Sequence, residues 1–200
     1  MIDDQEIDMF KAAISLDKDH QFILPLRKQL WLSFGKVEMD DPVKSKMNWA
    51  HTRRTRLALS TCGKVIPIWR QYFPASDIAE SATGAAQAYL NDQCGFETAC
   101  DELDILLGGL DNARDLDEQQ SRALMAGYAC CGALFIAISD ADCDAPDELD
   151  EDLDCWDYSM YAAAAYAGGF PGSGVRESAR MKEFWFWYLE EALAIARIPV

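Results

Sequence analysis

The sequence predicts an all-α protein: one irregular bundle of about seven or eight helices. Apolar residues recur at spacings of three and four along several stretches, which is typical of helices with one buried face. Nowhere do β-branched residues alternate with polar ones over the length of a strand, and no Asn-Gly or Asp-Gly hairpin turn occurs. A chain of 200 residues, half of them apolar, can bury one core without a metal ion or disulfide. We therefore expect a single domain over residues 1–200.

The first two predicted helices cover residues 21–36 and a long stretch beginning near residue 44. The apolar face of the first consists of Ile23, Leu26, Leu30, Phe34 and Val37. Gly35 and the Asp41-Pro42 pair end it. The apolar stripe of the second consists of Ala58, Cys62, Val65 and Trp69. Pro67 is expected to kink or restart this helix, because proline has no amide proton to donate.

Three further helices are expected in the middle of the chain. After the break at Phe73-Pro74, Ser76 or Asp77 can cap a helix that runs to Leu90. The next covers residues 96–107 and is closed by Gly108-Gly109. The apolar run 123–138 predicts the central helix of the core. Its 16 residues are fewer than the ~20 that cross a bilayer, so we expect no membrane span.

The last two predicted helices flank a glycine-rich connection. Residues 156–167 are alanine-rich and helical, and the loop 168–174 that follows contains four glycines. The final helix is expected over residues 175–197. Its successive apolar residues at 184–189 indicate a helix buried between neighbours.

Charge is sorted along the chain. Residues 43–76 contain seven Lys and Arg and no acid, a pattern that we interpret as a helix whose bases pair with acids on neighbouring helices. Residues 140–157, the acidic block, contribute −10 of the net −16 and contain no Lys or Arg. The block is either a solvated loop or an interaction surface. As a surface it would contact a partner through Asp140, Asp142, Asp144, Asp147, Glu148, Asp150, Glu151, Asp152, Asp154 and Asp157, with Trp156 and Tyr158 as aromatic anchors.

No motif for catalysis, metal binding or cofactor binding is found. The two histidines, His20 and His51, fit neither a metal site nor a catalytic triad. The seven cysteines have no regular spacing, which indicates reduced thiols in a cytoplasmic protein, and the acidic amino terminus does not resemble an export signal. A pI near 4.4 argues against direct binding to nucleic acid.

The acidic block partly matches a calcium-binding loop. The matching residues, at positions 1, 3, 5, 9 and 12 of such a loop, are Asp140, Asp142, Asp144, Glu148 and Glu151. Position 6 requires glycine for a sharp turn, but it is Ala145 here. A calcium-binding or adaptor protein, or an uncharacterised helical enzyme that uses the 140–157 carboxylates, therefore stays an alternative.

One stretch resembles a known family. Its Arg56-Leu57-Ala58-Leu59 opening, its Pro67-Ile68-Trp69 and Phe73-Pro74 elements and its alanine-rich helix at 85–90 are similar to the fifth of the numbered immunity-protein families of bacterial polymorphic toxin systems. The residues 77–80 depart from the turn that we expect in that family.

The resemblance implies an all-α cytoplasmic protein without catalytic residues, which neutralises a cognate toxin made by the same cell. Many such toxin domains are nucleases, which are basic around the site that holds phosphate. An acidic surface could meet that site as a substrate mimic, with fast association that weakens as salt rises. The expected partner is thus a basic toxin, and the sequence leaves the oligomeric state open.

Overall fold

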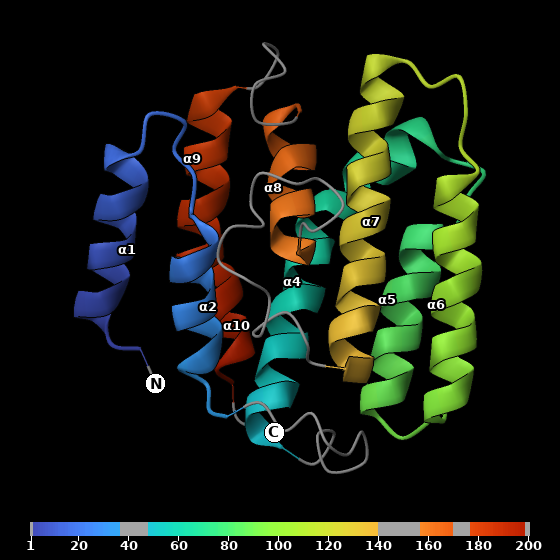
Figure 1. The fold of residues 1–200 in the computed structure, drawn as a ribbon, viewed down its shortest axis with the longest axis horizontal. Coiled ribbons are helices and arrows are strands. Elements are labelled where there is room, and N and C mark those ends of the chain that lie inside the picture. The colour runs from blue at the N-terminus through green and yellow to red at the C-terminus, as the bar shows by residue number, and fades with distance from the viewer. Residues whose placement is uncertain (1, 37–47, 140–156, 170–176, 199–200) are drawn as a thin grey trace.

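The computed structural model describes residues 2–36, 48–139, 157–169 and 177–198, and every regular element among them is a helix. If the continuous segment 178–196 is counted as one helix, the described residues form eight helices, which confirms the predicted all-α bundle. In Figure 1, α1 and α6 lie at the two edges, with α8, α4 and α7 between them.

The sequence patterns considered above do not predict α1 (Asp4–Leu16). Its start is nevertheless encoded locally by two reciprocal hydrogen bonds. The Glu6 backbone N–H donates to the Asp3 side chain, and the Asp3 backbone N–H donates to the Glu6 side chain. Phe10 and Ile14 then form its short buried face.

The two basic-rich helices differ from their predicted bounds. α2 (Leu24–Leu32) is shorter than expected, with Pro25 in its first turn. α4 (Trp49–Tyr72) is continuous through Pro67 and does not restart there. The proline ring is exposed, and so is Gly63 one turn earlier, around which an added side chain would meet no other atom. The helix therefore tolerates the lost hydrogen bond on its solvent side.

The next two helices form a hairpin at one edge of the bundle. α5 (Ile78–Leu90) agrees with its prediction. α6 (Phe96–Asp111) continues through the glycines that were expected to end it. A Cβ placed on Gly109 would lie 3.0 Å from the Ile78 side chain, so this glycine permits close helix packing and does not serve as a cap here.

α7 (Glu118–Ser139) is the centre of the fold. It packs against α4, α5, α6 and α8. It is long and apolar enough to cross a membrane by length and composition, yet most of it is buried inside the protein, as expected of a core helix. A Cβ on Gly127 would lie 2.7 Å from Leu110 and 2.9 Å from Trp69, which shows how closely the neighbouring helices approach.

The carboxyl-terminal part adds α8 (Tyr158–Ala167), α9 (Ser178–Trp187), the π-helical turn η4 (Tyr188–Ala192) and α10 (Leu193–Ala196). Gly168 ends α8 in the left-handed region, with φ at 93°. The final helix buries Phe184, Trp185 and Tyr188, whereas Phe186 and Trp187 are only half-buried.

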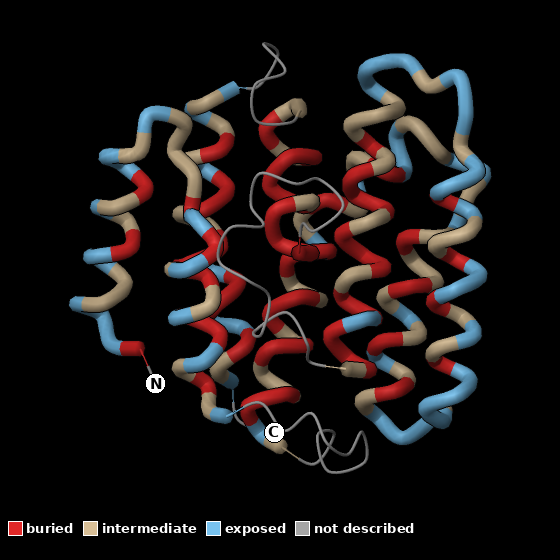
Figure 2. Tube along the Cα trace, in the orientation of Figure 1, coloured by how far each residue is buried: buried red, intermediate tan, exposed pale blue. Residues whose placement is uncertain are grey.

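Figure 2 shows where the core lies. Buried residues concentrate in α4, α7, α8 and α9, whereas the outward faces of α1 and α6 are mainly exposed. The outward faces of the two edge helices are therefore open to solvent.

The contact between α7 and α8 generates a stability prediction. A Cβ on Gly132 would lie 2.9 Å from Tyr158 Cβ and 3.2 Å from its Cα, which belongs to the backbone of α8. Gly132→Ala should therefore lower the free energy of unfolding, because overpacking costs about 1–3 kcal/mol, more than the roughly 1 kcal/mol of helix propensity gained. Urea unfolding followed by circular dichroism measures this.

Gly84→Ala is the matched control. Gly84 lies inside α5 with open space around its Cα, so the same substitution should raise the free energy of unfolding by about 0.5–1 kcal/mol. Equal effects of the two substitutions would contradict the close α7–α8 contact.

Candidate functional site

The predicted partner-binding residues fall into two groups. Asp140, Asp142, Asp144, Asp147, Glu148, Asp150, Glu151, Asp152, Asp154 and Trp156 lie outside the described residues. Asp157 and Tyr158 are described, and both are buried, with 8% and 2% of their surface exposed. In this structure neither side chain is placed to contact a partner, so for these two residues the expected surface role is replaced by a structural one.

Asp157 joins two distant helices. Its Oδ1 accepts from the backbone N–H of Ser159 at 2.8 Å and so caps the start of α8. Its Oδ2 accepts from Nε and Nη2 of Arg27 on α2, at 3.0 and 2.5 Å. The Arg27 side chain is fully buried, and its Nη1 donates to the Phe22 carbonyl. Each charge of the pair is thus matched inside the core.

Tyr158 belongs to a neighbouring polar network. Its hydroxyl lies 2.9 Å from that of Tyr188, which also accepts from the Trp31 indole N–H at 2.9 Å. Burial raises the pKa of Tyr188 well above its ordinary value, so this phenol stays protonated. The network links α2, α8 and the π-helical turn. It does so through Tyr158, which directly follows Asp157 in the sequence.

The described residues at the two limits of the acidic block belong to the helical bundle. The last residue of the block, Asp157, forms an ion pair with Arg27. Ser139, which precedes the block in the sequence, is the last residue of α7. Because α7 and α8 pack against each other, the block begins and ends on adjoining elements.

The described contacts of the α4 bases include carbonyl groups and aromatic rings besides the acids that were predicted. Arg54 is buried. It donates to the carbonyl of Trp31, in the last turn of α2, and to that of Gly35, which follows this helix. Arg56 donates to the carbonyl of Ile198, and Lys64 lies over aromatic rings of the carboxyl-terminal helices. Arg70 forms an ion pair with the carboxylate of Glu80 on α5.

The cysteines and histidines offer no built site among the described residues, where no group of three potential metal ligands occurs. The partial calcium match lies within residues 140–151, outside the described ranges. Cys62, Cys130 and Cys131 are buried, and burial raises the pKa of Cys131 to about 12. Such thiols are poor nucleophiles at neutral pH. His51 Nε2 donates to the Ile136 carbonyl at 2.8 Å, inside the core.

A second acidic region, which the sequence analysis missed, lies on α5 and α6. Residues 71–113 contain eight carboxylates and no Lys or Arg. On α6 the exposed carboxylates Glu97, Asp101 and Asp104 share a face with Ile105, which is 69% exposed. The signal in the sequence that could have revealed this region is the absence of Lys and Arg over 43 residues. Such an absence is less conspicuous than a run of Asp.

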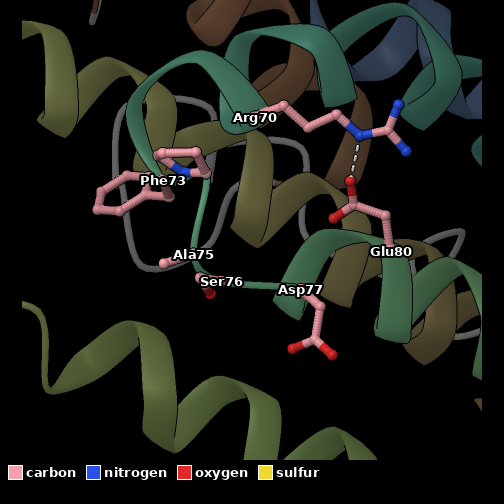
Figure 3. A pocket seen from close by; sticks show the side chains of 7 residues that line it. Arg70, Phe73, Ala75, Ser76, Asp77 and Glu80 are labelled. Carbon is pink, nitrogen blue, oxygen red and sulfur yellow. Dashed lines mark hydrogen bonds and ion pairs between the residues drawn. The ribbon is translucent and has the colours of Figure 1, made fainter.

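One end of this acidic region forms a pocket of about 550 Å³ between the end of α4 and the start of α5 (Figure 3). It is lined by Arg70, Phe73, Pro74, Ala75, Ser76, Asp77 and Glu80. The turn is fixed by Trp69, whose indole N–H donates to the Ser76 carbonyl at 3.0 Å and whose ring stacks on Phe73 at 4.4 Å. The pocket therefore lies within the stretch that carries the family resemblance.

The chain matches a known protein family. A family model described as immunity protein Imm5 matches residues 7–195, which include almost all of the described helices. No curated protein matches the chain.

The buried pair of Arg27 and Asp157 gives a second stability prediction. Asp157→Asn keeps a side chain that can cap α8 but removes the charge that Asp157 places beside the buried Arg27, so the free energy of unfolding should fall by about 3–5 kcal/mol. Asp101→Asn, an exposed carboxylate on α6, should change it by less than about 0.5 kcal/mol.

A double-mutant cycle separates the pair from the cap. Arg27→Met combined with Asp157→Asn should cost less than the sum of the two single substitutions, because the double variant buries no lone charge. Additive costs in urea unfolding would contradict a direct energetic coupling between the two side chains.

Proposed function

Because the chain belongs to the Imm5 family of immunity proteins, we propose that it binds a cognate bacterial toxin and neutralises it by stoichiometric contact. The observation that carries this proposal is the family match over nearly the whole chain. The all-α fold accords with it. In this proposal the protein works in the cytoplasm of the toxin-producing cell, by binding and without catalysis.

The acidic block is the contact surface that we propose. Residues 140–156 contain nine carboxylates and Trp156, with no base among them. The residues on either side of it, Ser139 and Asp157, lie at the end of α7 and the start of α8. Asp157 and Tyr158 are left out of the contact, because they hold the core together at that point.

This arrangement suits a basic toxin, such as a nuclease domain. Clustered carboxylates attract a positively charged site over roughly 10 Å at moderate salt and increase the rate of encounter. Carboxylates can also occupy the positions that phosphates take in a nuclease site. A calcium-binding protein that uses Asp140, Asp142, Asp144, Glu148 and Glu151 is the second candidate, and it would show a calcium-dependent rise in melting temperature.

The prediction concerns binding to the cognate toxin made by the same cell. Changing the nine carboxylates of residues 140–156 to Asn and Gln should weaken the affinity at least about a hundredfold and reduce its salt dependence, since the attraction is electrostatic. Isothermal titration calorimetry at about 50 and 300 mM NaCl measures both, and growth rescue on co-expression reports neutralisation.

A matched pair of variants controls for net charge. Asp150→Asn with Asp152→Asn removes two charges from the block, whereas Asp4→Asn with Asp8→Asn removes two exposed ones from α1. The first pair should weaken binding at least about fivefold and the second less than twofold. Binding that is equally strong in all variants would place the contact elsewhere, and no binding by the wild type would overturn the proposed function.

A further inference from the structure

We propose that the pocket between α4 and α5 is a second contact site, which takes an arginine or lysine side chain of the partner protein. The inference rests on the proposed function for the identity of that partner, a toxin, but the pocket's preference for a cation is a property of this chain alone. Three observations support it: a preformed shape, carboxylate oxygens that lack partners, and the charge of the surrounding helices.

The pocket is held open by its own framework. Trp69 is buried in α4 and fixes the following turn through its bond to the Ser76 carbonyl and its stacking on Phe73. A cavity of about 550 Å³ is therefore present before any partner arrives. Preorganisation of this kind reduces the entropy lost on binding.

The polar wall of the pocket has unused hydrogen-bond acceptors. Arg70 Nε donates to Oε1 of Glu80, whereas Oε2 of Glu80 is buried and has no hydrogen-bond partner. Asp77 is exposed at the start of α5, and its side chain makes no capping hydrogen bond. A buried carboxylate oxygen without a donor is unfavourable, so a donor group from a ligand would be stabilising.

The charge of the site selects a cation. The start of a helix attracts anions in general, but here two carboxylates already occupy that position and Arg70 is engaged by Glu80. The three charged groups sum to −1. Beyond Arg70 the chain has no base before Arg114, so no nearby base in the α5–α6 hairpin offsets this charge.

The apolar wall suits the stem of a long basic side chain. Phe73 and Pro74 line the pocket together with the charged groups, and Figure 3 draws Phe73 on the side away from the Arg70–Glu80 pair. An arginine or lysine could lay its methylene groups along this wall while its charged end reaches Glu80 and Asp77. Arg70 is 64% exposed and can move aside without disturbing the core.

The pocket is tested first with small probes, independently of any toxin. Spectra of ¹⁵N-labelled protein are recorded with N-acetyl-arginine methylamide, with the uncharged N-acetyl-citrulline methylamide and with inorganic phosphate. The indole N–H of Trp69 and the backbone N–H groups of Ser76 and Asp77 are the reporters. We expect saturable shifts with the arginine probe, at least tenfold weaker binding of the citrulline probe, and no shift at these reporters with phosphate.

Variants locate the binding. Asp77→Asn and Glu80→Gln should each weaken the arginine probe at least threefold, whereas Asp101→Asn, which removes one charge from the far part of α6, should not. Asp77 is exposed, and its substitution leaves the Arg70–Glu80 pair intact. If a lowered melting temperature shows that Glu80→Gln disturbs folding, the result for Asp77→Asn decides. Equal binding of the arginine and citrulline probes, or shifts caused by phosphate, would overturn the proposal.

The cognate toxin made by the same cell then tests the role of the pocket. If the wild type binds this toxin, Asp77→Asn and Glu80→Gln should weaken the affinity at least fivefold and Asp101→Asn less than twofold. Toxin binding that is unchanged in all three variants overturns the pocket's role while leaving the proposed function standing. A wild type that binds the arginine probe but no toxin supports the cation site and overturns the proposed function.

Discussion

The ion pair between Arg27 and Asp157 connects parts of the fold that lie 130 residues apart. Arg27 holds the Phe22 carbonyl before α2, and Asp157 caps α8, so the pair fixes the start of one helix against the start of another. Because both charges are removed from water, the arrangement tolerates little displacement of either helix. The adjoining contact of Trp31, Tyr188 and Tyr158 adds the carboxyl-terminal helix to the same junction.

Acidic residues have two different roles in this chain. Asp157 is the last of a run of carboxylates, and its partner Arg27 is buried. On α6, by contrast, carboxylates remain exposed beside the apolar Ile105. The same residue type thus stabilises the bundle at one point and leaves a charged surface at another, and the difference lies in the neighbours that the fold provides.

Sequence patterns predicted the fold class and most of the helices, because core-facing residues recur with the helical period. They failed where the outcome depends on tertiary neighbours. The glycines at 108 and 109 resemble a helix end, but one of them accommodates Ile78 from α5. Pro67 resembles a break, yet it lies on the solvent side of α4. Asp157 could not be distinguished from its acidic neighbours, since its partner Arg27 is remote in sequence. The pocket at Glu80 likewise depends on how α4 meets α5.

The uneven placement of charge has an electrical consequence for the described helices. α4 contains five Lys and Arg and no acid, whereas α6 contains five Asp and Glu and no base. Since α6 lies at one edge of the bundle and α4 nearer its middle, these two helices form a dipole whose negative end is the α6 edge. In the field of a charged neighbour such a dipole experiences a torque as well as a pull. The torque favours orientations in which the α6 edge faces a positively charged partner.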